Sequence, residues 1–233
     1  MWLVLHIPKT AGTSLRRALD KHLGKSNVIR DYGPDAPATS GIVREYIYSG
    51  DVSKGPANLV HKISNDSKKI LIGHFHLGKY SDFIETNKII TFVRNPLVRI
   101  CSEYLHKKEN GKFIGTFSEF IQIPGYQNVQ LGYLDNSSSG AFIGITEQYD
   151  QSLQHINQMT GWDLSNFKKN VRQHGGGQKF AEHLSVHELD LFYKMNTADI
   201  DMYKSVSRQF AALEKPVQKD RSFLKWMKRN KQA

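Results

Sequence analysis

Cysteine and long apolar segments are nearly absent from this sequence. Cys101 is the only cysteine among the 233 residues, which excludes an intrachain disulfide and a metal site built from several cysteines. No apolar run approaches the roughly 20 residues that span a bilayer as a helix. The opening residues, MWLVLHIPKT, have no basic leader and only a short apolar run, unlike a signal peptide. We therefore expect a soluble protein of a reducing compartment.

Acidic residues are also scarce. The chain has 22 Asp and Glu against 32 Lys and Arg, so its formal net charge is +10. A field of this sign favours anionic partners such as phosphate, nucleic acid, acidic lipid or acidic glycan. Half of the charge lies in residues 214–233, which hold seven Lys and Arg and two acids. We expect this basic tail to be a solvated terminal segment, with docking on an acidic surface or on the protein's own core as the alternative.

Apolar and helical patterns alternate in the first half of the chain. Continuous apolar runs predict buried strands over residues 2–7, 68–76 and 87–95. Such runs are typical of parallel sheets that are covered on both faces. Helical spacing follows the first and the third of these strands, over residues 14–23 and 96–110. This alternation predicts an α/β architecture.

The second half has mostly helical patterns. Capping boxes at residues 116–119 and 185–188 predict two helix starts, and residues 142–147 predict one more short strand. Gly24 and Gly161 are predicted to end the helices that precede them. Residues 30–66 are predicted to be loops with minor elements, and residues 124–142 a long mobile loop. Because no linker composition interrupts the chain, we expect one domain over residues 1–233. It would be an α/β, P-loop-like domain with a central parallel sheet flanked by helices and a helical C-terminal half.

The sharpest motif joins the first strand to the first helix through HIPKTAGTSL. A glycine-bearing turn that enters a helix offers free backbone N–H groups and the positive end of the helix dipole to an anion. Lys9 adds a positive charge, and Thr10, Thr13 and Ser14 add hydroxyl donors. The spacing differs from GxxxxGK[ST], because the lysine precedes the glycine and no Gly-Lys-Ser/Thr follows to hold magnesium. The motif predicts an anion cradle.

A second motif, IITFVRNPLVRICSEYLH, joins the third strand to its helix. A phosphate-loop NTPase usually has a metal-binding aspartate at the end of such a strand, whereas this strand ends in Arg94. The planar guanidinium of arginine suits direct binding of a phosphate. Arg99, Ser102 and His106 follow at roughly helical spacing, which predicts a polar, basic helix face. The alternative is that Arg99 is merely solvated.

Taken together, the two motifs resemble the sulfotransferases that use 3′-phosphoadenosine 5′-phosphosulfate as donor. PKTAGTSL is similar to the family's loop for the 5′-phosphosulfate, and RNPLVRICSEY to its strand and helix for the 3′-phosphate. The amino-acid sequence of the first motif, PKTAGTS, is most similar to the carbohydrate branch of the family. That branch includes heparan sulfate and uronyl 2-O-sulfotransferases and many bacterial relatives. The similarity continues in family order through GH at 73–74, NVQLGYL at 128–134, FIGITEQYDQSL at 142–153 and NTADIDMY at 196–203.

This resemblance implies roles for individual residues. The phosphosulfate would be held by Lys9, Thr10, Ala11, Gly12, Thr13 and Ser14. Lys9 would also neutralise the bridging oxygen of the leaving group. Arg94 and Ser102 would hold the 3′-phosphate, and the segment with Thr146 and Glu147 would pass near the adenine. No metal is implied, because a sulfuryl group carries less charge than a phosphoryl group and can be stabilised by basic side chains and N–H groups.

A general base for the acceptor hydroxyl is expected among the histidines. His74 follows a predicted parallel strand at its carboxyl end, where such sheets present their ligands. In the 2-O-sulfotransferase relatives a histidine there acts as the base within an H-x-H pattern. His74 matches the second histidine of that pattern, but the first falls on Ile72. His76 forms a new H-x-H pair and is the alternative base. A zinc pair made by His74 and His76 is the remaining interpretation, without a third ligand in view.

Three classes of function remain open at this point. The first is an enzyme that transfers a sulfuryl group to a hydroxyl, with a carbohydrate or glycolipid as the expected acceptor. The second is a kinase-like nucleotide-binding protein, and the third a non-catalytic binder of acidic glycans or anionic surfaces. Tight binding of 3′-phosphoadenosine 5′-phosphate without magnesium would support only the first. Because the Golgi members of the family carry a membrane anchor and this sequence has none, we expect a bacterial-type enzyme in the cytoplasm.

Overall fold

The computed structural model describes residues 1–64, 69–134, 140–165 and 176–213. Five parallel strands form one sheet in the order β2-β3-β1-β4-β5. The strands are β1 (Trp2–Leu5), β2 (Val28–Asp31), β3 (Ile70–Gly73), β4 (Ile89–Val93) and β5 (Phe142–Ile145). Because all strands run the same way, their carboxyl ends meet at one edge of the sheet. The expected α/β fold with a central parallel sheet is confirmed.

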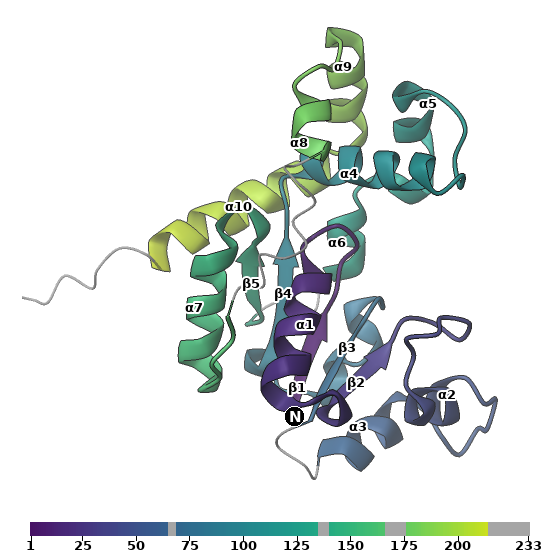
Figure 1. The fold of residues 1–233 in the computed structure, drawn as a ribbon, viewed down its shortest axis with the longest axis vertical. Helices are drawn as coiled ribbons and strands as arrows, with labels where there is room; N and C mark the ends of the chain where they lie inside the picture. Colours follow the sequence, from purple (N-terminus) through teal and green to yellow (C-terminus); the bar gives the residue numbers. More distant parts are fainter. Residues whose placement is uncertain (65–68, 135–139, 166–175, 214–233) are drawn as a thin grey trace, which may run out of the picture.

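Helices surround this sheet and extend beyond its carboxyl edge (Figure 1). In the first half they are α1 (Gly12–Leu23), α2 (Gly41–Ile47), α3 (Pro56–Ser64), α4 (Pro96–Glu109) and α5 (Phe117–Gln122). In the second half they are α6 (Val129–Leu134), α7 (Tyr149–Thr160), α8 (Gly176–Ala181), α9 (Val186–Met195) and α10 (Thr197–Leu213). The second half of the described chain is therefore mainly helical, as expected.

Alternate side chains along each strand enter separate apolar cores. On one face, Val4 and its neighbours pack with residues of α1 and α7. On the other face, Leu3 and Leu5 pack with residues of α2, α3, α6 and α10. A third apolar cluster joins α4, α5 and α9 beyond the carboxyl ends of the strands (Figure 1). The sheet edge that carries the expected site residues thus lies between the two-sided core and this helical group.

One predicted loop contains regular structure instead. Residues 124–142 include a short 3-10 turn and the helix α6. The prediction was wrong there because the two N–H groups at the start of α6 are bonded by a carboxylate of α10, far along the chain, which local periodicity does not reveal. Residues 30–66 were predicted to be loops with minor elements, and they contain the end of the edge strand β2 and the short helices α2 and α3.

The starts and ends of helices were predicted more accurately. Helix α1 ends at Gly24 and α7 at Gly161, both with positive φ, and both capping boxes are present. The predicted strands over 68–76 and 87–95 are confirmed but shorter, at four and five residues. The basic tail at about 214–233 lies outside the described residues.

Candidate active site

The loop between β1 and α1 has an unusual backbone. Lys9 and Ala11 have φ values of 70° and 67°, and the only other non-glycine residue with positive φ in the described ranges is Asn128. A non-glycine residue pays a steric penalty in this conformation, and such residues concentrate at functional sites. Ala11 precedes Gly12, the first residue of α1, and its carbonyl accepts from Ser14 and Leu15. The N–H groups of Gly12 and Thr13, which precede these bonds, therefore lie at the carboxyl edge of the sheet.

The hydroxyl-bearing residues of this loop differ in where their side chains lie. Thr10 is buried, and its Oγ1 donates to the Ile7 carbonyl at 2.8 Å, which closes the loop on itself. Thr13 is exposed and Ser14 is half-buried at the start of α1. The Thr10 hydroxyl is therefore bonded within the loop, whereas the side chains of Thr13 and Ser14 lie at the start of α1.

Arg94 connects the two sequence motifs directly. It follows β4, and its Nη1 donates to the Lys9 carbonyl at 3.2 Å, while its Nε lies 3.9 Å from Oε1 of Glu147. Burial lowers the pKa of Arg94 and Glu147 opposes this, but guanidinium stays protonated at any pH of interest. Lys9, Arg94 and Glu147, taken from three parts of the sequence, therefore lie together at one edge of the sheet.

Glu147 and Thr146 tie β5 to the end of β4. Thr146 donates its hydroxyl to the Val93 carbonyl at 2.9 Å. Glu147 accepts from the Asn95 backbone N–H at 3.0 Å and from the Tyr203 hydroxyl at 3.0 Å. Both residues are thus adjacent to Arg94, as a shared site requires.

Gln130, which the sequence analysis did not single out, holds the backbone of Arg94. Its side chain accepts from the Arg94 N–H at 2.8 Å and donates to the Arg94 carbonyl at 2.9 Å. Asp199 of α10 in turn accepts from the N–H groups of Gln130 and Leu131. Gln130 and Asp199 are both buried. The segments 128–134 and 196–203, separate in sequence, therefore form one support for Arg94.

The predicted basic face of α4 is only partly present. Arg99 is 1% exposed, so neither a solvated Arg99 nor one on an open basic face is found. Its Nη2 lies 3.5 Å from the Tyr126 carbonyl, and Asp199 and Glu103 lie near enough to favour its charge. Ser102 is half-buried, and α8 packs against it so closely that a Cβ on Gly177 would be 3.0 Å from the Ser102 Cβ. His106 alone is exposed.

His74 follows β3 and contacts two residues from neighbouring strand ends. Its Nε2 lies 3.1 Å from Nδ1 of His6, and the same His6 nitrogen lies 3.1 Å from the Tyr32 hydroxyl. The three rings meet edge to face, with centroid distances of 4.3–5.8 Å. Neither His6 nor Tyr32 was predicted from the sequence to contact His74. Each directly follows a strand of the same parallel sheet, but the strand order that brings them to His74 is not visible in a local pattern.

His6 also contacts the loop between β1 and α1. The ring of His6 is so close to Gly12 that a Cβ there would be 1.8 Å from its Cδ2. Glycine is therefore required at position 12 for packing as well as for an open helix start. His6 consequently lies between the first turn of α1 and the His74 ring.

Both histidines of this pair are held neutral by their surroundings. Burial lowers the pKa of His6 well below its usual 6.5, helped by His74 and Arg16. His74 remains exposed on one side, and partial burial lowers its pKa to about 4, with Glu103 acting against the shift and Arg16 with it. A neutral imidazole is the form that can accept a proton.

His76 lies apart from this pair. Its Nδ1 is 2.7 Å from the Gly132 carbonyl, and its ring stacks on Tyr133 at 5.2 Å. The side chain is exposed and directed to α6 rather than to His6. Within the described ranges, no three His, Cys, Asp or Glu side chains are grouped as ligands of a metal ion.

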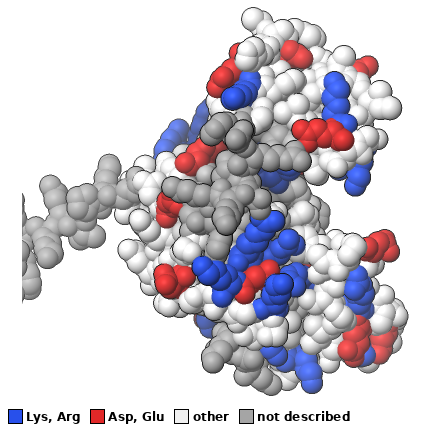
Figure 2. Space-filling view, in the orientation of Figure 1, with Lys and Arg blue, Asp and Glu red and all other residues white. Residues whose placement is uncertain are grey.

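Positive charge gathers along α1. On the face shown in Figure 2, Lys and Arg atoms lie over α1, whose sequence includes Arg16, Arg17 and Lys21. Arg16 also lies over the Tyr32 ring at 5.6 Å. This arrangement suits an anionic ligand at the start of α1.

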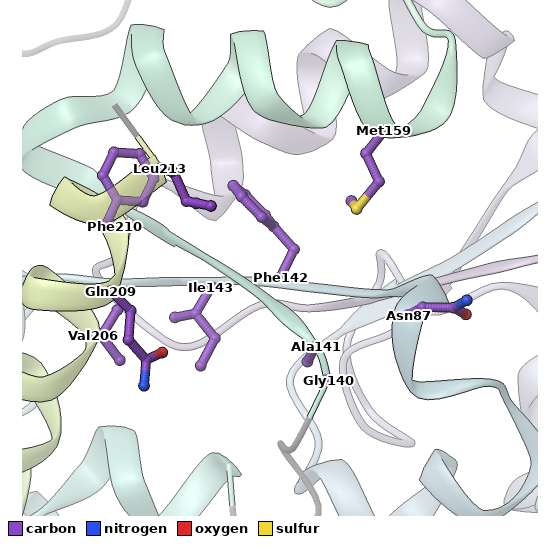
Figure 3. Close-up of a pocket in the computed structure, with 10 residues that line it drawn as sticks. All are labelled: Asn87, Gly140, Ala141, Phe142, Ile143, Met159, Val206, Gln209, Phe210 and Leu213. Carbon is purple, nitrogen blue, oxygen red and sulfur yellow. The ribbon is translucent and has the colours of Figure 1, made fainter. Parts of the chain in front are cut away.

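An apolar cavity of about 320 Å³ lies elsewhere in the fold (Figure 3). It is bounded by the first residues of β5 and by α7 and α10, with Phe142, Met159 and Phe210 among its lining residues. Phe142 begins β5, so the cavity is at the amino edge of the sheet, opposite His74 and Arg94. It is therefore separate from the candidate active site.

Comparison with known proteins assigns the family. Residues 2–128, more than half of the chain, match a model of the Sulfotransferase family. The chain belongs to the Sulfotransferase family. A search of curated protein sequences finds no match. Among solved structures, mouse sulfotransferase SULT7A1 complexed with PAP is similar, with 14% sequence identity and a TM-score of 0.44. The similarity covers 80% of this chain and 65% of that one, so this chain spans less than two thirds of the mouse protein.

No helix in the described parts of this chain has the length and apolar character needed to cross a membrane. The matched residues 2–128 contain both sequence motifs together with His6, Tyr32 and His74. The supporting segments of α6 and α10 extend beyond the match, but they contact it through Gln130.

Proposed function

We propose that this protein transfers a sulfuryl group from 3′-phosphoadenosine 5′-phosphosulfate to a hydroxyl of a carbohydrate or glycolipid. The observation that carries the proposal is the contact between Arg94 and the Lys9 carbonyl, because it joins two anion-binding motifs into one site. A donor with anions at both its 5′ and 3′ positions needs two such groups at a fixed separation. The carbohydrate nature of the acceptor rests on the resemblance of the PKTAGTS motif alone.

In this proposal the donor lies along the carboxyl edge of β1 and β4. Lys9 and the segment from Thr10 to Ser14 bind the 5′-phosphosulfate through the lysine charge and the open N–H groups of α1. Arg94 and Ser102 bind the 3′-phosphate, and Thr146 and Glu147 lie beside the adenine. Lys9 also stabilises the negative charge that develops on the bridging oxygen as the S–O bond breaks.

His74 is the proposed general base. The acceptor oxygen attacks sulfur and forms the new S–O bond, while the hydroxyl proton passes to the His74 imidazole. The bond between sulfur and the bridging oxygen breaks, and 3′-phosphoadenosine 5′-phosphate leaves. This assignment is supported by the neutral state of His74 and by its place among other strand ends. His76 is the less favoured base because its Nδ1 is engaged by Gly132.

The test is a transfer assay with labelled sulfate over glycans, glycolipids and phenols. Lys9→Ala should reduce turnover by at least about 100-fold, because loss of a charge-assisted contact to a developing charge costs about 3 kcal/mol or more. Lys88→Ala is the matched control, since Lys88 lies at the amino edge of β4 and pairs with Glu85. Binding of 3′-phosphoadenosine 5′-phosphate without magnesium should persist in the control. Unchanged turnover of Lys9→Ala would refute the donor site.

A further inference from the structure

The base proposed above needs a defined tautomer, and the structure holds a group able to set it. A neutral imidazole has one donor nitrogen and one acceptor nitrogen. The Nε2 of His74 lies 3.1 Å from Nδ1 of His6, and a hydrogen bond between them requires one of these two nitrogens to carry the hydrogen. If it belonged to His6, the His74 lone pair at Nε2 would already be used. Only a hydrogen on His74 Nε2 leaves a lone pair on His74 Nδ1.

We propose that His6 is the positioning residue of the base: its Nδ1 accepts the Nε2–H of His74 and thereby leaves His74 Nδ1 to take the acceptor proton. This inference rests on the proposed function, and it assigns a role to a residue of a different strand from the base. Among the described residues, His74 Nδ1 has no hydrogen-bond partner, as a group that receives a proton from an incoming hydroxyl requires.

The surroundings of the pair are consistent with this direction of the hydrogen bond. His6 is 8% exposed, and its ring is confined by Gly12, so it cannot rotate away without displacing the start of α1. Burial raises the pKa of Tyr32, so its hydroxyl stays protonated 3.1 Å from the same His6 Nδ1. Because that nitrogen has one lone pair, the inference requires the Tyr32 hydrogen to point away from His6, which a rotatable hydroxyl allows. The other charged groups that influence His74 are Arg16 of α1 and Glu103 of α4. Neither is close enough to His74 for a hydrogen bond or an ion pair.

The same contact stabilises His74 once it has accepted the proton. The imidazolium then has N–H groups on both nitrogens, and the Nε2–H already has a neutral acceptor in His6. A hydrogen bond to the charged form raises the pKa of a base. Removing the His6 nitrogen should therefore make His74 a weaker base, as well as a less well oriented one.

The deciding experiment compares His6→Phe, which keeps a ring against Gly12 but has no nitrogen, with His6→Asn, whose Oδ1 takes the place of Nδ1. His6→Phe should lower kcat about 10-fold to 100-fold, less than the loss of a general base itself. The acid limb of kcat, expected near pH 4 in the wild type because His74 must be neutral, should move to lower pH. His6→Asn should recover most of the rate, and binding of 3′-phosphoadenosine 5′-phosphate should stay within a few-fold.

His22→Phe on the exposed side of α1 is the control for replacing any histidine. The rate could fall in His6→Phe while the acid limb of the kcat–pH profile stays in place and His6→Asn recovers no rate. These results would show that His6 only packs against Gly12. That result, like a wild-type rate and pH profile in His6→Phe, would overturn the inference. His6→Gln, which has no acceptor at the Nδ1 position, replaces His6→Phe if the latter does not fold.

A second measurement does not depend on activity. Nitrogen NMR of histidine-labelled protein distinguishes protonated from unprotonated ring nitrogens. At neutral pH we expect His74 to have a protonated Nε2 and an unprotonated Nδ1. In His6→Phe we expect this single tautomer to be replaced by a mixture of the two tautomers. The opposite tautomer of His74 would overturn the inference even if no acceptor had been found. Full activity of His74→Ala would instead overturn the proposed base, and with it only the catalytic part of the argument.

Discussion

Arg94 makes two contacts at the proposed donor site. Its Nη1 fixes the Lys9 carbonyl, while its Nε lies 3.9 Å from Oε1 of Glu147. Among the described residues Glu147 is the one carboxylate paired with Arg94, and a guanidinium that is 19% exposed keeps capacity for a phosphate. Arg94 is thus both a part of the loop and a candidate ligand of the nucleotide.

Replacement of Arg94 should separate these roles. Arg94→Ala should weaken the binding of 3′-phosphoadenosine 5′-phosphate by roughly 10-fold to 100-fold, the equivalent of about 1.5–3 kcal/mol for a charged hydrogen bond. The affinity for AMP, which lacks the 3′-phosphate, should fall far less. Calorimetric titration of both nucleotides measures the difference, with Arg208→Ala on the exposed side of α10 as control. Equal losses for both nucleotides would mean that Arg94 only shapes the loop.

For individual residues, the sequence was informative where the candidate functional residues lie within one short segment. Lys9, Gly12 and Arg94 belong to short motifs, and their neighbours in sequence are their neighbours in space. His6 and Tyr32 could not be chosen in the same way, because their proximity to His74 depends on the strand order β2-β3-β1. That order is set by crossovers and not by any local pattern.

The helix α6 and the start of α10 act as one element. Asn128 accepts a bond from the Asp199 N–H and donates to the Met195 carbonyl, and its own N–H donates to Asn196. Asn128 has a φ of 47°, a conformation that asparagine tolerates better than most residues. These bonds place Gln130 on the Arg94 backbone. A segment that was predicted to be a loop is therefore what supports Arg94.

Gln130→Ala should test this support. It leaves the N–H and the carbonyl of Arg94 without their partner, which should cost about 1–3 kcal/mol of unfolding free energy. Affinity for 3′-phosphoadenosine 5′-phosphate should fall with it, whereas Gln122→Ala on the exposed end of α5 should change neither. Urea unfolding measures the free energy of unfolding, and nucleotide titration measures the affinity for 3′-phosphoadenosine 5′-phosphate. Loss of stability without loss of affinity would show that Gln130 supports the fold but not the site.

Across the whole molecule, the boundaries set by glycines and capping boxes were predictable, and the short elements were not. Gly24 and Gly161 end their helices as local chemistry demands. The edge strand β2 is different, because Asp31 at its end is fully buried and holds Lys79, Tyr48 and Tyr80. A buried carboxylate with three partners from distant segments stabilises a strand that has almost no apolar pattern of its own.

The buried histidine pair makes the stability of the whole protein depend on pH. The pKa of His6 is lowered well below 6.5 and that of His74 to about 4. Between those values and 6.5, the unfolded chain binds protons that the folded protein does not, so stability is fully present above about pH 6.5 and is lost as the pH falls. Each such histidine contributes a slope of at most about 1.4 kcal/mol per pH unit, and the partly exposed His74 contributes less than the buried His6.

Urea unfolding between pH 7 and pH 5 should therefore show a steady loss of stability on acidification. His6→Asn removes the buried group and should flatten this slope, while His22→Asn, on the exposed side of α1, should leave the wild-type slope unchanged. The carboxylates contribute little to the comparison, because their ordinary pKa values lie below this window and both variants retain them. Asp31, whose pKa is lowered by Lys79 and two tyrosines despite its burial, would lose its stabilising contribution only at still lower pH. A wild-type slope that persists in His6→Asn would mean that His6 is already protonated in the folded protein at pH 5, and a charged His6 could not accept the hydrogen of His74.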